Sequence, residues 1–237
     1  MTGLILAAGK GSRLSSGTGD SLCKPLVPAA GKPLIAYSLD NIALMGLDRA
    51  VVVIRRSGAQ IADALGTSYG KVRIEYVVQD EPTGLVSSIL AGCAAVSDDV
   101  VLQLSDEIFI SPNLSGSAPE LFSQTDLAVG YTVDSEDKIK RNYSLELSAD
   151  GRVLGCVEKP RTVTNDLKGT GFCYFSAPCI QLLRDCYDPE KNEPNDLCDL
   201  INMLIGCGKT ALGFLVAEEE INVNTPDDLL YANRRLS

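Results

Sequence analysis

A short apolar run that leads directly into a Gly-x-Gly turn constrains this chain more than any other feature. Residues Leu4–Ala8 are apolar, Gly9 and Gly11 follow, and the cations Arg13 and Lys24 come next along the sequence. Glycine lets the backbone approach a ligand closely, because no Cβ stands in the way. Successive backbone N–H groups in such a turn can bind an anion, and Arg and Lys both suit phosphate oxygens. The pattern therefore predicts a polyphosphate site after the first strand of an α/β fold.

Two familiar glycine-rich loops do not fit this pattern. A dinucleotide-binding fingerprint needs a third glycine, where this chain has Leu14, and an acidic residue after the second strand, where it has two arginines. A P-loop needs the string G-x-x-x-x-G-K-[ST], which follows none of the predicted strands. An ordinary glycine-rich turn is the remaining alternative, but such a turn would require neither Arg13 nor Lys24.

The net charge of −10, from 21 Lys and Arg against 31 Asp and Glu, limits the choice of partners. Nucleic-acid binding requires a basic surface, so we expect no nucleic-acid partner. A few local cations can still hold a small anionic ligand at short range. No apolar run approaches the ~18 residues of a membrane span, and no basic segment precedes the first strand. These features predict no membrane contact and a cytoplasmic location.

The chain has no histidine and eight cysteines, which form no C-x-x-C pair. This composition disfavours a zinc site and removes Ser-His and Cys-His nucleophiles. The cysteines are expected to be reduced thiols that pack as small apolar side chains. Any catalysis must therefore rely on carboxylates, cations, a metal ion and the positioning of substrates.

Strand and helix patterns alternate through the first half of the chain and imply a parallel sheet with right-handed crossovers. The predicted strands there cover residues 2–8, 50–54, 72–78 and 100–104, with helices at 33–45, 58–65 and 84–96. The second half predicts strands at 126–133, 143–147, 152–157, 171–175 and 211–216, with helices at 178–186, 196–206 and 226–235. We therefore expect one α/β domain over residues 1–237. Its sheet is Rossmann-like, mixed but mainly parallel, flanked by helices, and it carries a small mixed lobe.

Several short motifs recur in one order along the chain, and together they carry a family resemblance. The first is L-A-A-G-x-G-S-R-L followed by Lys-Pro-Leu, and the later ones are Gln79 with Gly84-Leu85, Asp106, Glu158-Lys159-Pro160, Gly169-Thr170-Gly171 and Asn222–Leu229. The chain resembles the sugar-phosphate nucleotidyltransferase superfamily, the nucleotide-sugar pyrophosphorylases. Its pattern is most similar to glucose-1-phosphate thymidylyltransferases and to uridylyl- and cytidylyltransferases of sugar and polyol phosphates.

The resemblance implies transfer of a nucleoside monophosphate from an NTP to a sugar-1-phosphate or sugar-like phosphate, which releases pyrophosphate and forms an NDP-sugar. The implied partners are an NTP, with a pyrimidine base favoured, and a phosphorylated small-molecule acceptor. A cytidylyltransferase acting on a cyclitol, alditol or phosphonate stays an alternative, as does a non-catalytic nucleotide-binding subunit of the same fold. A glycosyltransferase is disfavoured, because the D-x-D pair typical of that class is missing after residue 104. A homo-oligomer is possible.

The resemblance also assigns residues to the nucleotide, which we expect in the half of the chain from about residue 1 to 110. The implied nucleotide-binding residues are Leu6, Ala8, Gly9, Gly11, Ser12, Gln79 and Gly84. A Gln amide both donates and accepts, so Gln79 can pair with the donor and acceptor of a pyrimidine edge. Gly84 would let the base approach the backbone. A simple turn over residues 80–84 is the alternative.

A magnesium site is predicted where Asp106 follows a buried strand, because ligands gather beyond the carboxyl ends of such strands. Mg²⁺ takes one or two carboxylates together with phosphate oxygens and waters. Glu107 is an alternative ligand. The resemblance places the second ligand at Asn222 or Asn224, with a slight preference for Asn224. The alternative reading is that Asn224-Thr225 caps the last helix.

The acceptor is expected in the half from about residue 111 to 237. The implied acceptor-binding residues are Tyr143, Glu158, Lys159 and Gly171. The carboxylate of Glu158 could bind vicinal hydroxyls and Lys159 the phosphate, which favours a polyhydroxylated acceptor over phosphocholine. Tyr143 matches the family's Tyr-Gly pair, although Ser144 replaces the glycine.

The implied mechanism is in-line attack of the acceptor phosphate on the nucleotide α-phosphorus. It needs no strong base, because the nucleophile is already an anion, so catalysis is positioning and charge neutralisation. Lys24 and Arg13 are the predicted catalytic residues. Lys24 would bridge the α-phosphate and the incoming phosphate, and Arg13, with Mg²⁺ on Asp106, would stabilise the leaving pyrophosphate. Arg141 and Arg161 could be either phosphate contacts or solvated surface cations.

Overall fold

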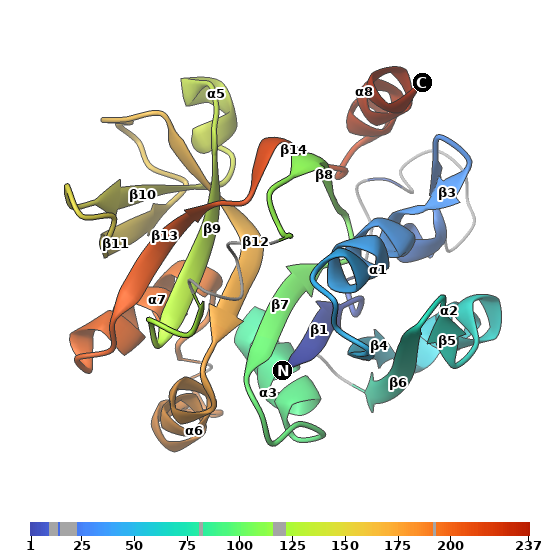
Figure 1. Ribbon diagram of the computed structural model, residues 1–237, viewed down its shortest axis with the longest axis horizontal. Helices are drawn as coiled ribbons and strands as arrows, with labels where there is room; N and C mark the ends of the chain where they lie inside the picture. The colour runs from blue at the N-terminus through green and yellow to red at the C-terminus, as the bar shows by residue number, and fades with distance from the viewer. Residues whose placement is uncertain (10–13, 15–22, 81–82, 116–121, 192) are drawn as a thin grey trace.

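The structure is a computed structural model of the 237-residue chain. It describes residues 1–9, 14, 23–80, 83–115, 122–191 and 193–237. A central sheet of ten strands crosses the molecule (Figure 1). These strands are β1 (Thr2–Leu6), β4 (Arg49–Arg55), β5 (Ser68–Tyr69), β6 (Val72–Gln79), β7 (Val100–Leu104), β9 (Leu127–Val133), β10 (Tyr143–Leu147), β11 (Val153–Glu158), β12 (Leu167–Phe175) and β13 (Ala211–Leu215).

Helices flank this sheet, and two small ribbons accompany it. The helices are α1 (Leu34–Leu44), α2 (Ala59–Leu65), α3 (Leu85–Cys93), α5 (Glu136–Ile139), α6 (Ala177–Cys186), α7 (Leu197–Gly206) and α8 (Pro226–Leu236), with 3₁₀ turns η1 (Lys24–Leu26) and η2 (Arg56–Gly58). The ribbons pair β2 (Pro28–Ala29) with β3 (Lys32–Pro33), and β8 (Glu107–Pro112) with β14 (Ala217–Asn222). Among the described residues, each helix is too short or too polar to cross a bilayer.

The first half of the chain forms the parallel part of the sheet, with β1 between β7 and β4, and β6 beside β4. The residues from Leu4 to Ala7, at the end of β1 and just after it, are all apolar because both faces of this strand are covered. Leu4 and Leu6 pack in the core cluster that contains α3 residues, whereas Ile5 and Ala7 pack in the cluster that contains α1 residues. A strand covered on both faces loses the alternation of polar and apolar residues. The expected Rossmann-like α/β fold is confirmed.

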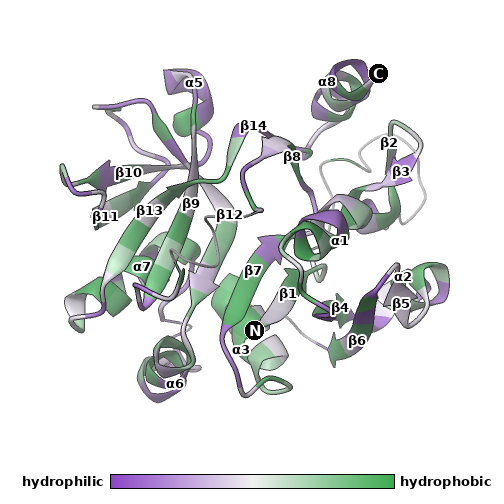
Figure 2. Cartoon of the chain, in the orientation of Figure 1, coloured by the Kyte–Doolittle hydropathy of each residue, from purple (hydrophilic) through white to green (hydrophobic). Residues whose placement is uncertain are grey.

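The second half joins the same sheet through β12, which runs antiparallel to β7, β9 and β10. The strand β13 pairs in parallel with β9. Hydrophobic residues dominate β9 and β12, whereas α8 carries several hydrophilic positions (Figure 2). The mixed lobe is therefore a continuation of the central sheet, because β12 contributes to both halves.

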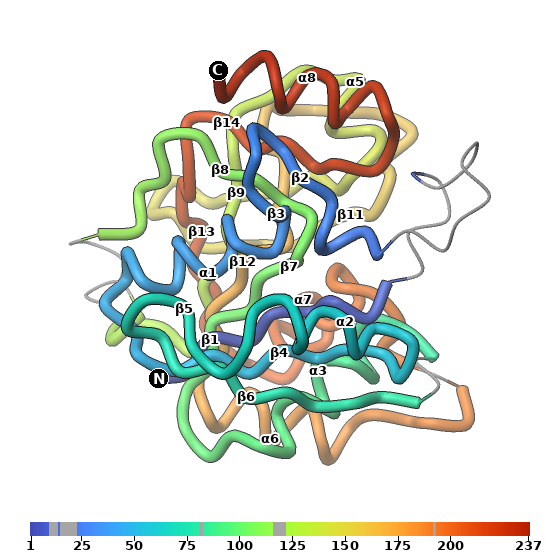
Figure 3. Tube along the Cα trace, turned by 90° about the vertical axis from the view of Figure 1, so that its right-hand side faces the viewer, coloured from blue at the N-terminus to red at the C-terminus, as the bar shows by residue number. Residues whose placement is uncertain are grey.

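The β8–β14 ribbon was not predicted from the sequence, and it joins two distant segments of the chain. Asn222 pairs with Glu107, and the backbone N–H of Val223 donates to the carbonyl of Asp106 at 2.9 Å. The segment that follows β7 is thereby fixed beside the segment that leads into α8. Figures 1 and 3 place α8 at one end of the molecule, away from the N-terminus.

Candidate functional site

Three predicted site residues from distant parts of the sequence meet beyond the end of β7. Lys24 begins η1, Asp106 follows β7, and Asn224 precedes α8. The Lys24 Nζ donates to Asp106 Oδ2 and also to Asn224 Oδ1, the latter at 3.0 Å. Lys24 is only 9% exposed, so its ammonium is held between these two oxygens with little contact with solvent.

The amide pair Asn222–Asn224 forms one wall of this site. Asn224 Nδ2 donates to Asn222 Oδ1 at 2.6 Å. The cap of α8 is supplied by Thr225, whose hydroxyl accepts from the backbone N–H of Asp228 at 3.2 Å. Asn224 therefore leaves the capping to Thr225 and directs its own side chain to Lys24. The alternative that Asn224-Thr225 caps the last helix is confirmed for Thr225, and this cap coexists with the contact between Asn224 and Lys24.

The oxygens of Asp106 and Asn224 already converge on one cation, the Lys24 ammonium. Carboxylate and amide oxygens are the hard ligands that Mg²⁺ takes, and the ion completes its octahedron with phosphate oxygens and water. Within the described ranges, no three His, Cys, Asp or Glu side chains cluster as a metal site. The donor set thus fits a magnesium ion shared with substrate phosphates, rather than a cage made by protein alone.

Glu107 was the alternative metal ligand, but its side chain turns into the sheet. Its two carboxylate oxygens accept from the backbone N–H of Gly171, each at 2.9 Å. Burial raises the pKa of Glu107 well above its usual range, and the nearby charges of Glu220 and Asp106 add to the shift. A buried carboxylate engaged with β12 is not presented to a metal at the Lys24 site.

Gly171 was predicted to bind the acceptor, and the structure places it inside the sheet. The residue is buried in β12 and donates its N–H to Glu107. A Cβ at this position would overlap with the side chain of Leu104 and lie 2.9 Å from Glu107 Oε1. The glycine is therefore required by packing between β12 and the β7–β8 segment.

Tyr143 was also predicted to contact the acceptor, and the structure buries it. The residue is 5% exposed, and its hydroxyl donates to the carbonyl of Thr170 at 2.7 Å. Its ring lies against Gly169, where an added Cβ would overlap with the ring carbons. Burial also raises the pKa of the phenol well above its usual range. Tyr143 thus packs in the core beneath the lobe, and its contact with an acceptor stays a prediction.

Glu158 and Lys159, which were predicted to bind the acceptor, lie at the exposed end of β11. Lys159 has a φ of 45°, a left-handed conformation that non-glycine residues rarely adopt and that is typical of functional segments. Its Nζ lies 2.8 Å from Glu158 Oε1, and its backbone N–H donates to the carbonyl of Asn142 at 2.7 Å.

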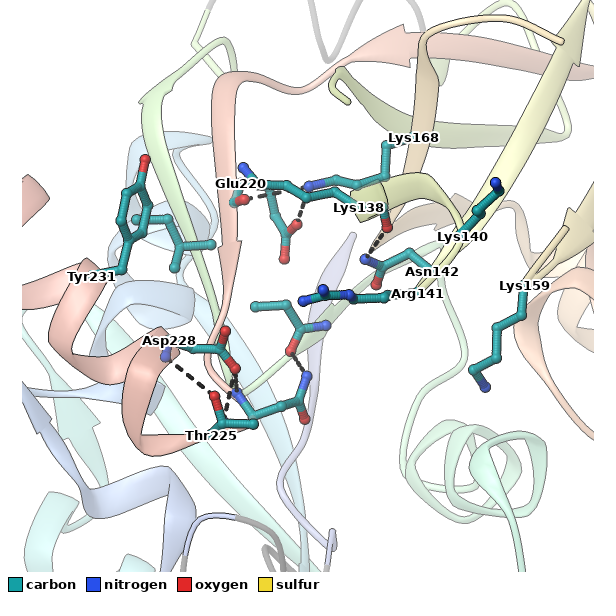
Figure 4. A pocket seen from close by; sticks show the side chains of 13 residues that line it. Lys138, Lys140, Arg141, Asn142, Lys159, Lys168, Glu220, Thr225, Asp228 and Tyr231 are labelled. Carbon is teal, nitrogen blue, oxygen red and sulfur yellow. Dashed lines mark hydrogen bonds and ion pairs between the residues drawn. The ribbon is translucent and has the colours of Figure 1, made fainter. Parts of the chain in front are cut away.

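A cavity of about 520 Å³ connects Lys159 with the Asn222–Asn224 wall. Figure 4 shows cationic side chains entering it from one side, with Glu220, Thr225, Asp228 and Tyr231 on the other. The cations that line it are Lys138, Lys140, Arg141, Lys159 and Lys168. Although the lining also includes Glu220 and Asp228, this number of cations in a chain of net charge −10 makes the cavity a candidate site for an anionic ligand.

A buried charge cluster at this cavity was missed by sequence reasoning. The Lys168 Nζ lies 2.7 Å from Asp134 Oδ2 and 2.7 Å from Glu220 Oε2. Burial by itself lowers the pKa of Lys168, but the two carboxylates outweigh it and raise that pKa above its usual value. For Glu220, burial raises the pKa despite the ion pair. The only signal in the sequence was a lysine inside the otherwise apolar and small-residue strand β12.

The nucleotide-binding residues that the structure describes lie at the carboxyl ends of β1 and β6. Leu6 and Ala8 are buried, so they can offer a ligand only backbone groups, and a Cβ at Gly9 would meet nothing within 4 Å. The Gln79 side chain accepts from Ser88 Oγ at 2.7 Å, which holds it against the start of α3 next to its N-cap, Gly84. The predicted residues Gly11, Ser12 and Arg13 lie outside the described residues.

Comparison with known proteins identifies the family of the chain. Residues 2–236 match the family described as Nucleotidyl transferase. A UTP–glucose-1-phosphate uridylyltransferase of Haloferax volcanii is 28% identical over 238 residues, covering 100% of this chain and 96% of the relative. A glucose-1-phosphate thymidylyltransferase of Mycolicibacterium smegmatis is 30% identical over 199 residues, covering 81% of this chain and 67% of the relative.

A solved structure of a UDP-glucose pyrophosphorylase complexed with UDP-glucose has the same fold, with a TM-score of 0.80 and 20% identity. The alignment covers 99% of this chain and 97% of that one. The match to the family extends over nearly the whole chain and includes the site residues described above. The chain therefore belongs to the nucleotidyl transferase family.

Proposed function

We propose that the protein transfers a nucleoside monophosphate from an NTP to a sugar-1-phosphate or a similar phosphorylated acceptor, with release of pyrophosphate. The observation that carries this proposal is the convergence of Lys24, Asp106 and Asn224 beside a cation-lined cavity. The names of the two relatives, a uridylyltransferase and a thymidylyltransferase of glucose 1-phosphate, support the same reaction. The proposal includes a cytoplasmic location and a preference for a pyrimidine NTP read by Gln79.

The two substrates would approach the site from opposite halves of the chain. Residues up to about 110 hold the nucleotide through the segment after β1, including Gly9 and Arg13, and residues from about 111 hold the acceptor. Lys24 lies where these halves meet, because Asp106 belongs to the first and Asn224 to the second. A single ammonium there can contact both the α-phosphate and the attacking phosphate, which neutralises charge as the new bond forms.

Asp106 would hold Mg²⁺ together with Asn224 or Asn222. Bound there, the ion would supply charge neutralisation on the phosphate oxygens. The residues of the chain do the rest by positioning. Lys159 and Glu158 orient the acceptor, and Lys24 aligns its phosphate with the α-phosphorus. The acceptor phosphate attacks as an anion, so no side chain has to remove a proton.

The test is pyrophosphate release by the purified protein with Mg²⁺, each of five NTPs, and a panel of sugar, cyclitol, alditol and phosphonate acceptors. We expect release only when one NTP and one acceptor are both present. Lys24→Ala should lose far more turnover than NTP affinity, because its contacts form mainly during transfer. Nucleotide binding without pyrophosphate release across the panel would instead indicate a non-catalytic binding subunit.

A further inference from the structure

One guanidinium in the cavity differs from the other cations that line it. Four of the five have a carboxylate partner: Lys138 with Asp134 at 3.3 Å, Lys140 with Glu136 at 2.6 Å, Lys159 with Glu158 at 2.8 Å, and Lys168 with Glu220 at 2.7 Å. Arg141 makes no side-chain hydrogen bond or ion pair with any residue that the structure describes. It is therefore the cation in this lining whose charge is available to a ligand.

The backbone that carries Arg141 is held in place on both sides. Its N–H donates to the carbonyl of Lys138 at 3.2 Å, and Asn142 Nδ2 donates to the same carbonyl at 3.0 Å. The carbonyl of Asn142 in turn accepts from the N–H of Lys159. Figure 4 shows Arg141 extending across the cavity toward the wall that runs from Glu220 to Thr225. That wall includes the proposed metal ligands Asn222 and Asn224.

A second unpaired group lies on the same wall. Glu220 is only 3% exposed and uses Oε2 for Lys168, but its Oε1 is buried and has no hydrogen-bond partner within the described part of the chain. Buried polar atoms are nearly always satisfied, so this carboxylate oxygen calls for a donor beyond the described residues, either an ordered water or a ligand group in the cavity that Glu220 lines. The donor expected beside several cations is a neutral hydroxyl, because an ammonium would be repelled.

We propose that Arg141 binds the reacting phosphoryl group of the acceptor and that Glu220 Oε1 accepts a hydrogen bond from a hydroxyl of the same molecule. This inference rests on the proposed transferase function and narrows the acceptor to a hydroxylated phosphate or phosphonate. The planar guanidinium presents two parallel N–H groups to two phosphoryl oxygens, a fixed geometry that the Lys159 ammonium, already paired with Glu158, lacks. Departing pyrophosphate offers the same chemistry, so the experiment must separate the two sources.

The experiment measures binding rather than turnover, so that it remains informative if the proposed reaction fails. Titration calorimetry in Mg²⁺ uses glucose 1-phosphate and pyrophosphate as separate probes on the wild type, Arg141→Gln and Arg141→Lys. Arg161→Gln is the matched control, because it removes the same charge from an exposed arginine outside the cavity lining. We expect Arg141→Gln to lower the affinity for glucose 1-phosphate about tenfold to a hundredfold, which is the range for a charged hydrogen bond. Arg161→Gln should change it less than about twofold.

Arg141→Lys should recover only part of the lost affinity, since a point charge replaces a two-pronged contact. Equal effects of Arg141→Gln and Arg161→Gln would overturn the assignment, because both variants share the change in net charge. A loss confined to pyrophosphate would also overturn it and would place Arg141 on the leaving group.

The hydroxyl contact is tested by comparing glucose 1-phosphate with inorganic phosphate on Glu220→Gln. Removing one negative charge strengthens the binding of both anions equally. The ratio of the two affinities therefore reports only the contribution of the hydroxyl contact. We expect this ratio to fall at least about threefold in Glu220→Gln while the melting temperature shows a folded protein. An unchanged ratio would refute the role of Glu220 and would indicate that its free oxygen is satisfied by an ordinary buried water.

Discussion

Replacing Lys168 by methionine should destabilise the protein strongly, because two carboxylates depend on its ammonium. Lys168 is 1% exposed, and its Nζ lies 2.7 Å from both Asp134 and Glu220. Methionine fills similar space but leaves Glu220 buried without a counter-ion. Breaking a buried pair by removing one partner costs about 3–5 kcal/mol, since the remaining charge is uncompensated. For a chain of this size, that loss corresponds to a fall in melting temperature of roughly 6–20 °C.

The assay is urea denaturation followed by circular dichroism, with the wild type, Lys168→Met and the double variant Lys168→Met/Glu220→Gln measured at neutral pH. The second substitution removes the buried charge that the first leaves behind. We therefore expect the double variant to recover at least about half of the lost stability. Surface-exposed Lys140→Met is the control, because its ion pair with Glu136 is exposed and worth about 0.3–0.5 kcal/mol.

A loss below about 1 kcal/mol in Lys168→Met would refute this reasoning, since it would mean that water reaches Glu220 freely. A double variant as unstable as the single one would refute it in another way. The cost would then come from lost packing of the lysine stem rather than from an uncompensated charge.

Three further predictions concern the segment after β7 and its contact with β12. Asp106→Asn should abolish metal-dependent pyrophosphate release while the protein stays folded, because the amide oxygen can still accept the hydrogen bond of Lys24. Unchanged turnover would exclude Asp106 as a metal ligand. Gly171→Ala should lower the free energy of unfolding, measured by urea denaturation, by about 1–3 kcal/mol, because its Cβ would overlap with Leu104. The control Gly206→Ala should not lower it, because the space around that Cβ is open. The pKa of Glu107 is higher in the folded protein than in the unfolded chain. Glu107 therefore adds to the free energy of unfolding below about pH 4.5, and this contribution is lost as the pH rises through the pKa of the folded state. Glu107→Gln should therefore show a shallower fall in stability from pH 5 to 8 than the wild type, and parallel profiles would contradict the shift.

The parallel half of the fold could be predicted from the sequence because its strands can be recognised as short apolar runs. A strand buried on both faces is an apolar run, and in this chain the runs at 50–54 and 100–104 became β4 and β7. The candidate metal site followed from the same logic. Asp106 comes directly after such a run, and ligands gather beyond the carboxyl ends of parallel strands.

The features that sequence reasoning missed depend on which way a side chain faces. Tyr143 begins a strand, where either direction fits a half-buried pattern, and only the packing against Gly169 shows that the ring turns inward.

The β8–β14 ribbon pairs two short segments 110 or so residues apart, one of which has three glutamates in a row after Ala217. Local composition disfavours a strand there, and only the tertiary pairing with β8 produces one.

The charge of the central site bears on the order in which ligands bind. Lys24 balances Asp106, and the second proposed metal ligand is a neutral amide, so the site has little net negative charge before a substrate arrives. A divalent ion would have to displace the Lys24 ammonium from Asp106 to bind, with only one carboxylate to compensate. Nucleotide phosphates supply the missing negative charge and give the displaced ammonium a new partner. Mg²⁺ and the NTP should therefore bind together, and the metal alone should bind weakly.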